Sequence, residues 1–323
     1  MEKETIIESG LKVAAIAGEG TAVISVSPVI LSAPERGTDI EVRISAPITG
    51  DQLPIIVFAH GYGSSLDGYA PLVNYWAAHG FVVVQPTFLD SRTLALGQDD
   101  PRTPLIWKYR VSDMKRILDD LNIIIEAIPG LSERVDKTRI AAAGHSFGAQ
   151  TTGMLLGARI LDADGNPGED LSDARIKAGI LLCAAGRGGE DLSPFAAANY
   201  PFMNPGYSYM TTPTLIVAGD QDHSPLTVRG PEWFYDAYLL SPGDKWLLTL
   251  FGGEHLLGGI SGYLVTETSD ENPERVAAVQ ALTWAYLRSA LYAGDKTWET
   301  ACNAFMDVQQ PIGSIKGKAQ ENA

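Results

Sequence analysis

The sequence predicts an α/β fold built on a mostly parallel central sheet with helices on both faces. Short unbroken apolar runs recur between residues 54 and 251, bounded by glycine or proline, which is typical of strands buried on both faces. Segments with helical spacing lie between these runs, and strands that alternate with helices form parallel sheets. Before residue 50 the pattern instead alternates, which predicts an antiparallel N-terminal part.

The antiparallel part is predicted from two neighbouring segments. In DIEVRISA, residues 39–46, Ile40, Val42 and Ile44 alternate with polar side chains, the period of a half-buried strand. The preceding run TAVISVSPVIL contains Pro28, which cannot donate to a central ladder and so predicts an edge strand.

Six apolar runs are expected to form the buried strands of the sheet. They are PIIVFA (54–59), FVVVQ (81–85), RIAAAG (139–144), AGILLCAA (178–185), TLIVAG (214–219) and KWLLTLF (245–251).

Two long helices are predicted between and after these strands. Residues 110–128 carry apolar side chains three and four places apart, and a Pro-Gly pair at 129–130 ends the pattern. Near the C-terminus, Asn272 and Pro273 are typical of an N-cap and a first helical turn, and Gly294 closes the apolar stripe that follows.

A single domain is expected to fill the chain, residues 1–323. Its core spans about residues 20–295, and no long helical cap lies between Ala185 and Thr214, so no large cap domain is predicted. The polar tail, about residues 309–323, is expected to be frayed.

Composition and charge exclude several classes of function. The chain is 45% hydrophobic and 20% charged, as in a soluble globule, and no apolar run reaches the length needed to span a membrane. Its net charge is −15, without a basic cluster, which argues against a nucleic-acid partner. The N-terminus MEKETIIESG lacks the apolar core of a signal peptide, which favours a cytoplasmic location. The sequence leaves the oligomeric state undetermined.

Neither a disulfide framework nor a metal site is predicted. Cys183 lies in an apolar run and is expected to be a buried free thiol, unpaired with Cys302. The acidic run DADGNPGED, residues 162–170, has its glycine at the fourth place, whereas a calcium-binding EF-hand loop needs it at the sixth. We therefore expect a solvated acidic turn there, and no cofactor.

The stretch GHSFG, residues 144–148, is the strongest functional signal. A serine between two glycines at a strand-to-helix junction is typical of a sharp turn that exposes its hydroxyl. The backbone strain costs roughly 1–3 kcal/mol. Glycine at positions 144 and 148 avoids collisions, and the helix N-terminus stabilises negative charge. Ser146 is therefore predicted to be a nucleophile.

A serine nucleophile needs a base, and His255 is the predicted one. It lies in the glycine-rich loop FGGEHLLGG after the last apolar run. His145 adjoins the serine and should point away from its hydroxyl. His60, His79 and His223 have contexts that suit a base less well.

The acid that orients the base should follow the strand TLIVAG, where Asp220 and Asp222 are the candidates. Asp222 is preferred because the third residue after the strand can reach sideways toward the histidine. Asp220 is expected to shape the turn by accepting hydrogen bonds from nearby N–H groups.

The loop VFAHGYGSS, residues 57–65, follows the first buried strand and predicts an oxyanion hole. The expected donors are the backbone N–H groups of Tyr62 and Phe147.

Aromatic side chains near these loops are the predicted substrate pocket, although they could equally pack a loop onto the sheet. The candidates are Tyr62, Phe88, Trp107, Phe195, Tyr200, Phe202 and Met203.

The four motifs HGYGSS, GHSFGA, GDQD and GGEH, in this order, resemble the α/β-hydrolase superfamily. The branch that the chain resembles holds chlorophyllase-like, dienelactone-hydrolase-like and platelet-activating-factor acetylhydrolase-like esterases, near polyester-degrading cutinases. The chain departs from dienelactone hydrolases in having serine at position 146. It departs from chlorophyllases at Phe147 and Ala149.

The predicted function is a serine carboxylic-ester hydrolase that acts through an acyl-enzyme on a neutral, fairly apolar ester, small or polymeric. The alternatives keep the same Ser146, Asp222 and His255 in an amidase, a C–C bond hydrolase or an acyl transferase. A non-enzymatic binding protein on the same fold is disfavoured because all the motif elements are present.

Overall fold

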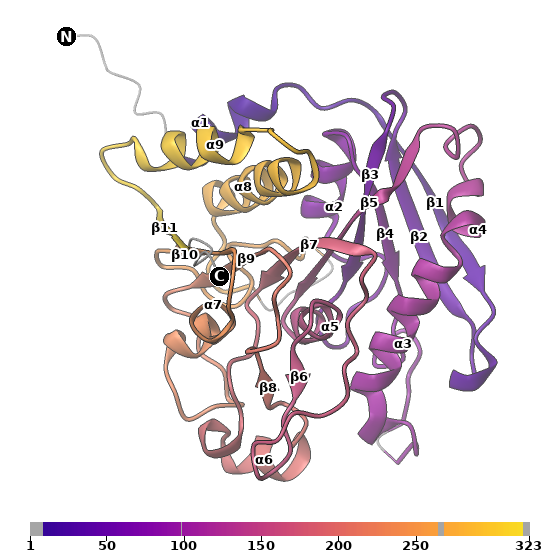
Figure 1. Cartoon of the computed structure of the whole chain (residues 1–323), viewed down its shortest axis with the longest axis vertical. Helices are drawn as coiled ribbons and strands as arrows, with labels where there is room; N and C mark the ends of the chain where they lie inside the picture. The colour runs from indigo at the N-terminus through magenta and orange to yellow at the C-terminus, as the bar shows by residue number, and fades with distance from the viewer. Residues whose placement is uncertain (1–8, 98, 264–267, 319–323) are drawn as a thin grey trace.

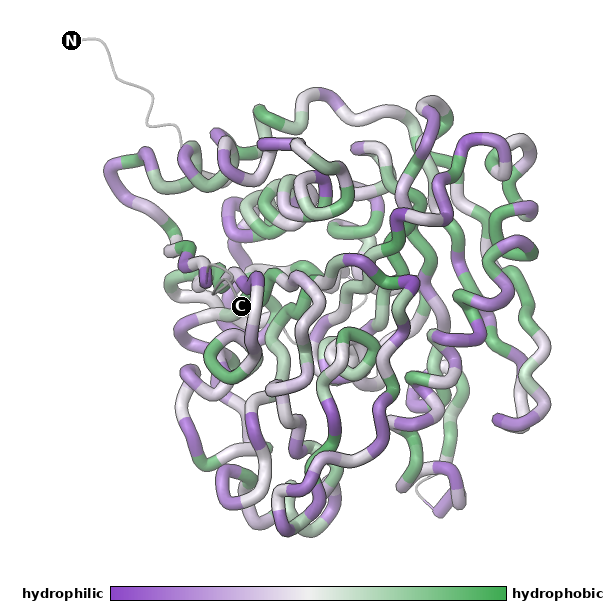
Figure 2. Tube along the Cα trace, in the orientation of Figure 1, coloured by the Kyte–Doolittle hydropathy of each residue, from purple (hydrophilic) through white to green (hydrophobic). Residues whose placement is uncertain are grey.

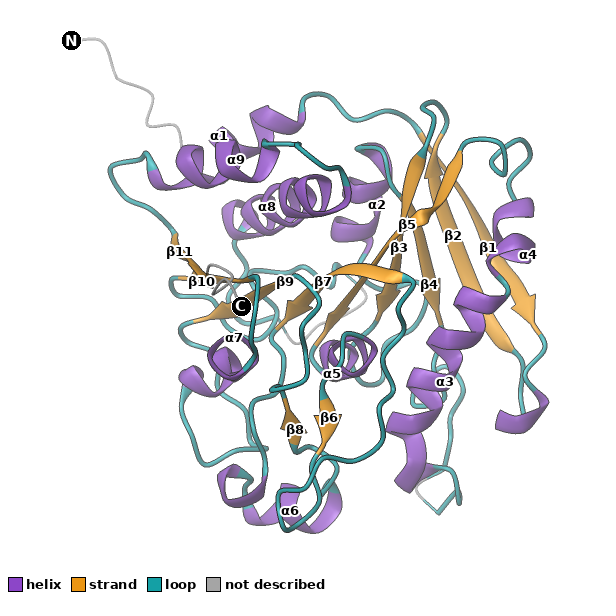
Figure 3. Cartoon of the chain, viewed as in Figure 1, coloured by secondary structure: helices purple, strands orange, loops and turns teal. Residues whose placement is uncertain are grey.

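A twisted, mostly parallel sheet runs through the molecule, with helices on both faces (Figures 1 and 3). The computed structural model describes residues 9–97, 99–263 and 268–318. Within these residues the main sheet has nine strands in the order β1-β2-β4-β3-β5-β7-β9-β10-β11. This architecture is the α/β-hydrolase fold that the sequence predicts.

Eight of the nine strands in the main sheet, all but β11, lie close to where the sequence places them. The main sheet contains β1 (Val23–Leu31), β2 (Ile40–Pro47), β3 (Leu53–Ala59), β4 (Val82–Pro86), β5 (Val135–His145), β7 (Ile176–Leu182), β9 (Thr214–Gly219), β10 (Lys245–Leu250) and β11 (Gly313–Lys318). A separate small ribbon pairs β6 (Arg159–Ile160) with β8 (Pro205–Gly206).

Strand direction follows the predicted division of the chain. β3, β4, β5, β7, β9 and β10 are parallel to their neighbours in this group, whereas β1 and β2 pair antiparallel at the N-terminal edge. β1 is the edge strand, and its register shifts between Val26 and Val29, on either side of Pro28. Proline has no N–H to donate, and at this irregularity of an edge strand the missing donor does not interrupt the hydrogen bonds of the central sheet.

Helices cover the sheet in two layers. One face carries α1 (Ser9–Ala17), α2 (Ala70–Ala78), α8 (Pro273–Leu291) and α9 (Thr297–Met306), and the other carries α3 (Ile106–Asp119), α4 (Leu121–Glu126), α5 (Phe147–Leu155) and α7 (Asp236–Leu240). The short helix α6 (Pro194–Asn199) lies in the segment between β7 and β8. Short 3₁₀ turns span Pro34–Arg36, Thr103–Leu105, Gly189–Asp191 and Pro231–Tyr235.

Side chains of the central strands point alternately to the two faces of the sheet and pack into two separate hydrophobic cores. In β3, Ile56 and Phe58 pack under α2 and α8, while Ile55, Val57 and Ala59 pack against the opposite layer. All five side chains are fully buried, and hydrophobic residues run along the strands in Figure 2. This two-sided burial explains the unbroken apolar runs in the sequence.

The helix predicted over residues 110–128 is in fact two helices. α3 ends at Asp119 and α4 begins at Leu121, because Asp120 leaves helical geometry while its N–H still bonds to the carbonyl of Arg116. The Asp120 carboxylate also accepts a hydrogen bond from the Arg116 side chain one turn earlier. The apolar spacing continues across the break, which is why periodicity alone does not reveal it.

The C-terminal region also corrects the prediction. Residues 313–318 are not frayed but form β11, which pairs antiparallel with β10 along its whole length. An edge strand is held by backbone hydrogen bonds, so the polar sequence GSIKGK suffices, with Ile315 packed against the core. Residues 319–323 lie outside the described part of the chain.

The predicted start of α8 and the free cysteines agree with the structure. α8 begins at the predicted cap, where the Asn272 side chain accepts the N–H of Arg275 at 2.9 Å, although the helix ends at Leu291. Cys183 and Cys302 are both free thiols. None of the helices in the described ranges has the length and apolar character that crossing a bilayer requires.

Candidate active site

Ser146 occupies a sharp turn between β5 and α5. Its backbone angles are φ 55° and ψ −121°, in a region that residues with side chains rarely adopt. The Ser146 N–H donates to the carbonyl of Leu182 on β7 at 2.9 Å, which holds the turn against the sheet. The turn places the serine at the N-terminal end of α5.

The flanking glycines are required by close backbone approach. A Cβ on Gly144 would lie 2.3 Å from the carbonyl oxygen of Gly148. One on Gly148 would lie 2.0 Å from the carbonyl oxygen of Ala59, at the end of β3. No side chain fits at either position, because both distances fall far below van der Waals contact. The turn and the first residues of the 60–63 loop are thus packed backbone to backbone.

The side chains of Ser146, His255 and Asp222 form one hydrogen-bonded row. His255 Nε2 lies 2.8 Å from Ser146 Oγ, and His255 Nδ1 lies 2.9 Å and 3.1 Å from the two carboxylate oxygens of Asp222. The Asp222 side chain is fully buried, while that of His255 is 39% exposed. A carboxylate only accepts, so Nδ1 carries a proton and Nε2 is free to take one from the serine.

The sheet brings these three residues together. Ser146 follows β5, Asp222 follows β9 and His255 follows β10, and the carboxyl ends of parallel strands meet at one edge. Asp220 faces elsewhere: its carboxylate accepts the N–H of Gly252 at 2.7 Å and so shapes the turn. Of the two candidate carboxylates, Asp222 is the one that contacts the imidazole.

The loop after β3 runs close to Ser146, and most of its N–H groups are engaged. Gly61 N–H donates to the hydroxyl of Tyr69, Gly63 N–H to the carboxylate of Asp90, and Ser64 N–H to the carbonyl of Gly61. Among the hydrogen bonds that the described residues form, none uses the N–H of Tyr62. The Tyr62 N–H therefore has no acceptor among the described residues.

A buried ion pair that the sequence analysis did not identify supports this loop. Arg110 of α3 binds both carboxylate oxygens of Asp90, at 2.8 and 2.9 Å, and donates to the carbonyl of His60 at 2.8 Å. Burial raises the pKa of Asp90, but the charge and hydrogen bonds of Arg110, together with the Gly63 N–H and His60, outweigh burial and hold the pKa below its ordinary value. Arg110 lies at a position of the apolar stripe of its helix. A charged residue at such a position is expected to be buried, and a buried charge needs a partner, so the sequence did hold a signal for this ion pair.

The remaining histidines have structural environments. His60 and His145 are buried, and burial lowers the pKa of each to about 3, with the Arg110 charge adding to the effect on His60. His79 stacks on Tyr75 at the end of α2, and His223 is exposed. His145 bonds to Tyr69 and to the main chain of His255, so its ring is not directed at the serine hydroxyl.

Aromatic rings form a continuous strip beside Ser146. Phe202 lies at the centre, with ring centroids 5.9 Å from Phe147, 6.2 Å from Trp107 and 6.1 Å from Tyr200. Tyr62 extends the strip at 6.3 Å from Phe147 and is 64% exposed.

The other predicted pocket residues take different places. Phe195 continues the strip beyond Tyr200, with centroids 5.8 Å apart. Phe88 is fully buried behind the 60–63 loop, with its ring 4.8 Å from that of His60, and Met203 is 8% exposed within the core. These last two side chains belong to the hydrophobic cores rather than to the aromatic strip.

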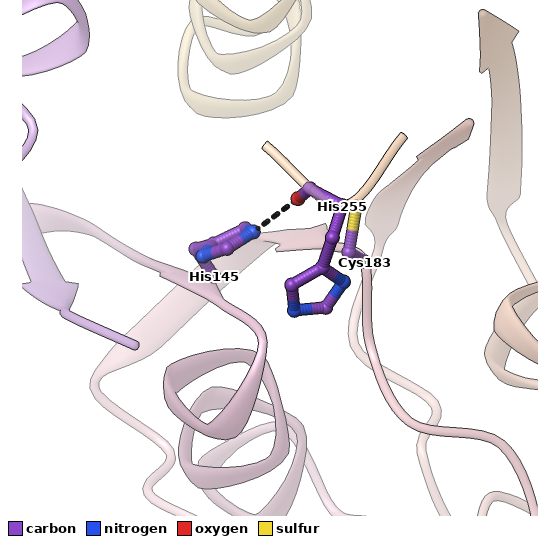
Figure 4. A group of neighbouring side chains, drawn as sticks. All are labelled: His145, Cys183 and His255. Atoms are coloured by element: carbon purple, nitrogen blue, oxygen red, sulfur yellow. Dashed lines mark hydrogen bonds between the residues drawn. The ribbon is translucent and has the colours of Figure 1, made fainter. Parts of the chain in front are cut away.

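One group of side chains in the described ranges has donor atoms close enough to hold a metal ion: His145, Cys183 and His255 (Figure 4). Both ring nitrogens of each histidine already have hydrogen-bond partners. Burial, and next the Asp222 carboxylate, raise the pKa of the Cys183 thiol. A metal here would have to break the row between Ser146 and Asp222, so the group does not fit a resident ion.

A family model and a cutinase each match part of this chain. Residues 13–159 match the family model described as Chlorophyllase. Cutinase est2 from Thermobifida alba is 26% identical over 206 residues, which cover 64% of this chain and 54% of the cutinase. The matched region thus spans about half the length of that relative. The family match includes Ser146 and the 60–63 loop, whereas Asp222 and His255 lie beyond it.

Fold, strand order and both similarities agree with one another. The chain therefore has the α/β-hydrolase fold, and it is similar to the Chlorophyllase family over residues 13–159 and to a cutinase esterase.

Proposed function

We propose that this protein is a serine carboxylic-ester hydrolase that works through an acyl-enzyme. The observation that carries the proposal is the row of hydrogen bonds from Ser146 Oγ to His255 Nε2 and from His255 Nδ1 to Asp222. A nucleophile, a base and a buried group that orients the base are the three parts that this chemistry requires. The similarity to a cutinase supports an ester as the substrate.

In the first half of the reaction, His255 Nε2 takes the proton of Ser146 as Oγ attacks the ester carbonyl. Asp222 stabilises the imidazolium that forms. The tetrahedral intermediate collapses, the C–O bond to the alcohol breaks, and His255 returns the proton to the departing alcohol. Water then attacks the acyl-enzyme with the same proton transfers and releases the acid.

The developing oxyanion needs donors, and the backbone N–H groups of Tyr62 and Phe147 are the proposed ones. Phe147 begins α5, where first-turn N–H groups have no intrahelical acceptor and the helix dipole favours negative charge. The N–H of Tyr62 is left over on a loop whose neighbouring N–H groups are engaged. One such donor is typically worth about 3–4 kcal/mol in the transition state.

The aromatic strip favours a neutral, fairly apolar substrate. Tyr62, Phe147, Phe202, Trp107 and Tyr200 present apolar surface beside Ser146. The net charge of −15 disfavours anionic substrates at long range. Phe195 lies at the outer end of the strip and would contact the longest substrates.

The proposal is tested by hydrolysis of p-nitrophenyl esters of increasing acyl length, with Ser146→Ala as the inactive variant. We expect turnover to fall by about 10⁴–10⁶-fold in the variant, because the nucleophile is lost. The substitution removes one oxygen and should leave the unfolding transition intact. Turnover that persists at the wild-type level in Ser146→Ala would end the proposal.

Matched substrates separate ester hydrolysis from the other reactions that the same residues could perform. We expect p-nitroanilides of the same acyl groups to be hydrolysed far more slowly than the esters. Added alcohols should divert little of the acyl group. Faster anilide cleavage would assign an amidase, and dominant transfer to alcohol would assign an acyl transferase.

A further inference from the structure

The side chain of His145 links the loop that carries His255 to the rest of the site. His145 Nε2 lies 2.7 Å from the main-chain carbonyl oxygen of His255, 110 residues away in the sequence, as the dashed line in Figure 4 marks. A carbonyl oxygen only accepts hydrogen bonds, so Nε2 carries the proton and donates it. The tautomer of this ring is thereby fixed.

The other ring nitrogen of His145 faces the hydroxyl of Tyr69 at 2.7 Å. Because Nε2 holds the proton, Nδ1 presents a lone pair and the hydroxyl donates to it. The same hydroxyl oxygen accepts the N–H of Gly61 at 3.1 Å. Every hydrogen bond from Gly61 through Tyr69 and His145 to His255 therefore has one possible direction.

This chain of hydrogen bonds is insulated from solvent and from changes in charge. Tyr69 and His145 are each 2% exposed. Burial, and next the charge of His255, lower the pKa of His145 to about 3, and burial raises the pKa of Tyr69 above its ordinary value. Both side chains thus stay neutral across the neutral pH range, so the donors and acceptors keep their roles.

Tyr69 is also held in place by its own main chain and ring. Its N–H donates to the carbonyl of Ser261 at 3.0 Å, beyond the far end of the His255 loop. Its ring packs on Phe58 of β3, with centroids 4.9 Å apart. Tyr69 is therefore anchored to the core while it contacts the loop before Tyr62 and the segment after His255.

We propose that Tyr69 and His145 are positioning residues that hold the Tyr62 N–H and the His255 imidazole at a fixed separation. The inference rests on the function proposed above. Gly61 precedes Tyr62 directly, so a bond to the Gly61 N–H orients the peptide that presents the oxyanion donor. The bond to the His255 carbonyl fixes the main chain of the base. The Tyr62 N–H and the His255 imidazole then act on the same ester carbonyl group. A displacement of either by about 1 Å can lower the rate by about 10²-fold.

Tyr69→Phe is the first test, because it removes the hydroxyl and keeps the ring. We expect kcat for a p-nitrophenyl ester to fall by about 10- to 100-fold while KM changes by less than about threefold. Tyr75→Phe is the matched control. The Tyr75 hydroxyl is buried on the neighbouring helix α2 and has no hydrogen-bond partner among the described residues, so kcat should be unchanged.

Substitutions of His145 test the other end of the chain. In His145→Gln the side-chain amide reaches the position of Nε2 and can still donate to the His255 carbonyl, although it no longer accepts from the Tyr69 hydroxyl, so kcat should fall less than in His145→Asn. The shorter side chain in His145→Asn cannot reach it and should lose as much as Tyr69→Phe. The kcat of the double variant Tyr69→Phe/His145→Asn should be no lower than that of the less active single variant. The two substitutions interrupt the same chain of hydrogen bonds, so their effects should not add.

Titration with a fluorophosphonate counts the competent sites, so that kcat is expressed per titrated serine. If the wild type lacks hydrolysis that depends on Ser146, the proposed function itself is wrong. If the wild type is active while Tyr69→Phe and His145→Asn keep the wild-type kcat per site, the positioning role alone is wrong. A loss confined to the number of titrated sites would also overturn it, because that loss is purely structural.

Discussion

The buried carboxylate of Asp222 lies 2.9 Å from Nδ1 of His255, whereas Asp220, two residues earlier, turns to the N–H of Gly252. The two aspartates are therefore close in sequence but have different partners. Only Asp222 can orient the imidazole of His255 and stabilise its positive charge.

The first prediction uses this difference. Asp222→Asn should lower kcat by about 10⁴-fold, because an amide can stabilise neither the required tautomer nor the imidazolium. Asp220→Asn should lower it by less than about tenfold, because an amide oxygen can still accept the N–H of Gly252. Steady-state hydrolysis of a p-nitrophenyl ester measures both. The reverse order of the two effects would assign the orienting role to Asp220.

The second prediction concerns the backbone contact between Gly148 and Ala59. Gly148→Ala should abolish activity and destabilise the fold, because the added methyl would lie 2.0 Å from a carbonyl oxygen in a packed segment. Gly153→Ala in the same helix is the matched control. There the nearest atom would be 3.8 Å away, and alanine should stabilise the helix by roughly 0.5–1 kcal/mol.

Urea unfolding monitored by circular dichroism, together with ester hydrolysis, compares the two glycine variants. In Gly148→Ala we expect a lower urea midpoint of unfolding and a loss of activity. In Gly153→Ala we expect no lowering of the midpoint and no loss of activity. Equal behaviour of the two proteins would contradict the close packing of the turn against the 60–63 loop.

The third prediction concerns stability as a function of pH. The pKa of buried His145 is about 3 in the folded protein and about 6.5 when it is unfolded, so between these values the unfolded chain binds the additional proton. Stability is therefore lost as pH falls below about 6.5, by up to about 1.4 kcal/mol per pH unit. His60 acts in the same sense, and Asp113, whose pKa burial raises to about 7, acts in the opposite sense.

His145→Gln isolates the contribution of one histidine from these opposing terms. As the pH is lowered from about 6 to about 4, the free energy of unfolding of this variant should fall less steeply than that of the wild type. The two slopes should differ by about 1.4 kcal/mol per pH unit, the value for one proton. Above about pH 7 the two slopes should coincide. Identical slopes at acid pH would show that His145 is protonated in the folded protein.

Much of the fold could be predicted from the sequence because a strand that is buried on both faces appears as an unbroken apolar run. The apolar runs of β3, β5 and β9 correspond closely to the observed strands. What could not be predicted depends on backbone pairing rather than on side-chain pattern. β11 is a polar segment held by its ladder to β10, and the break at Asp120 leaves the apolar spacing of its helix undisturbed.

The candidate site divides in the same way. Ser146 and His255 could be proposed from glycine-flanked motifs and from their order in the chain, since both features reflect local backbone requirements. Asp222 could be preferred over Asp220 because the third residue after the strand can reach sideways, and Asp222 is the carboxylate that contacts His255. The contacts of Tyr69, Asp90 and Arg110 could not be predicted, because each joins segments that become neighbours only in the folded protein.

The most direct test of the central claim is to trap the acyl group on the protein. After rapid mixing with a p-nitrophenyl ester and acid quenching, intact-mass spectrometry and peptide mapping should find one acyl group on Ser146. The same experiment on Asp222→Asn should find slower acylation of the same residue, and on Ser146→Ala none. An acyl group on another residue, or ester turnover without any covalent adduct during a burst of p-nitrophenol release, would contradict the proposed mechanism.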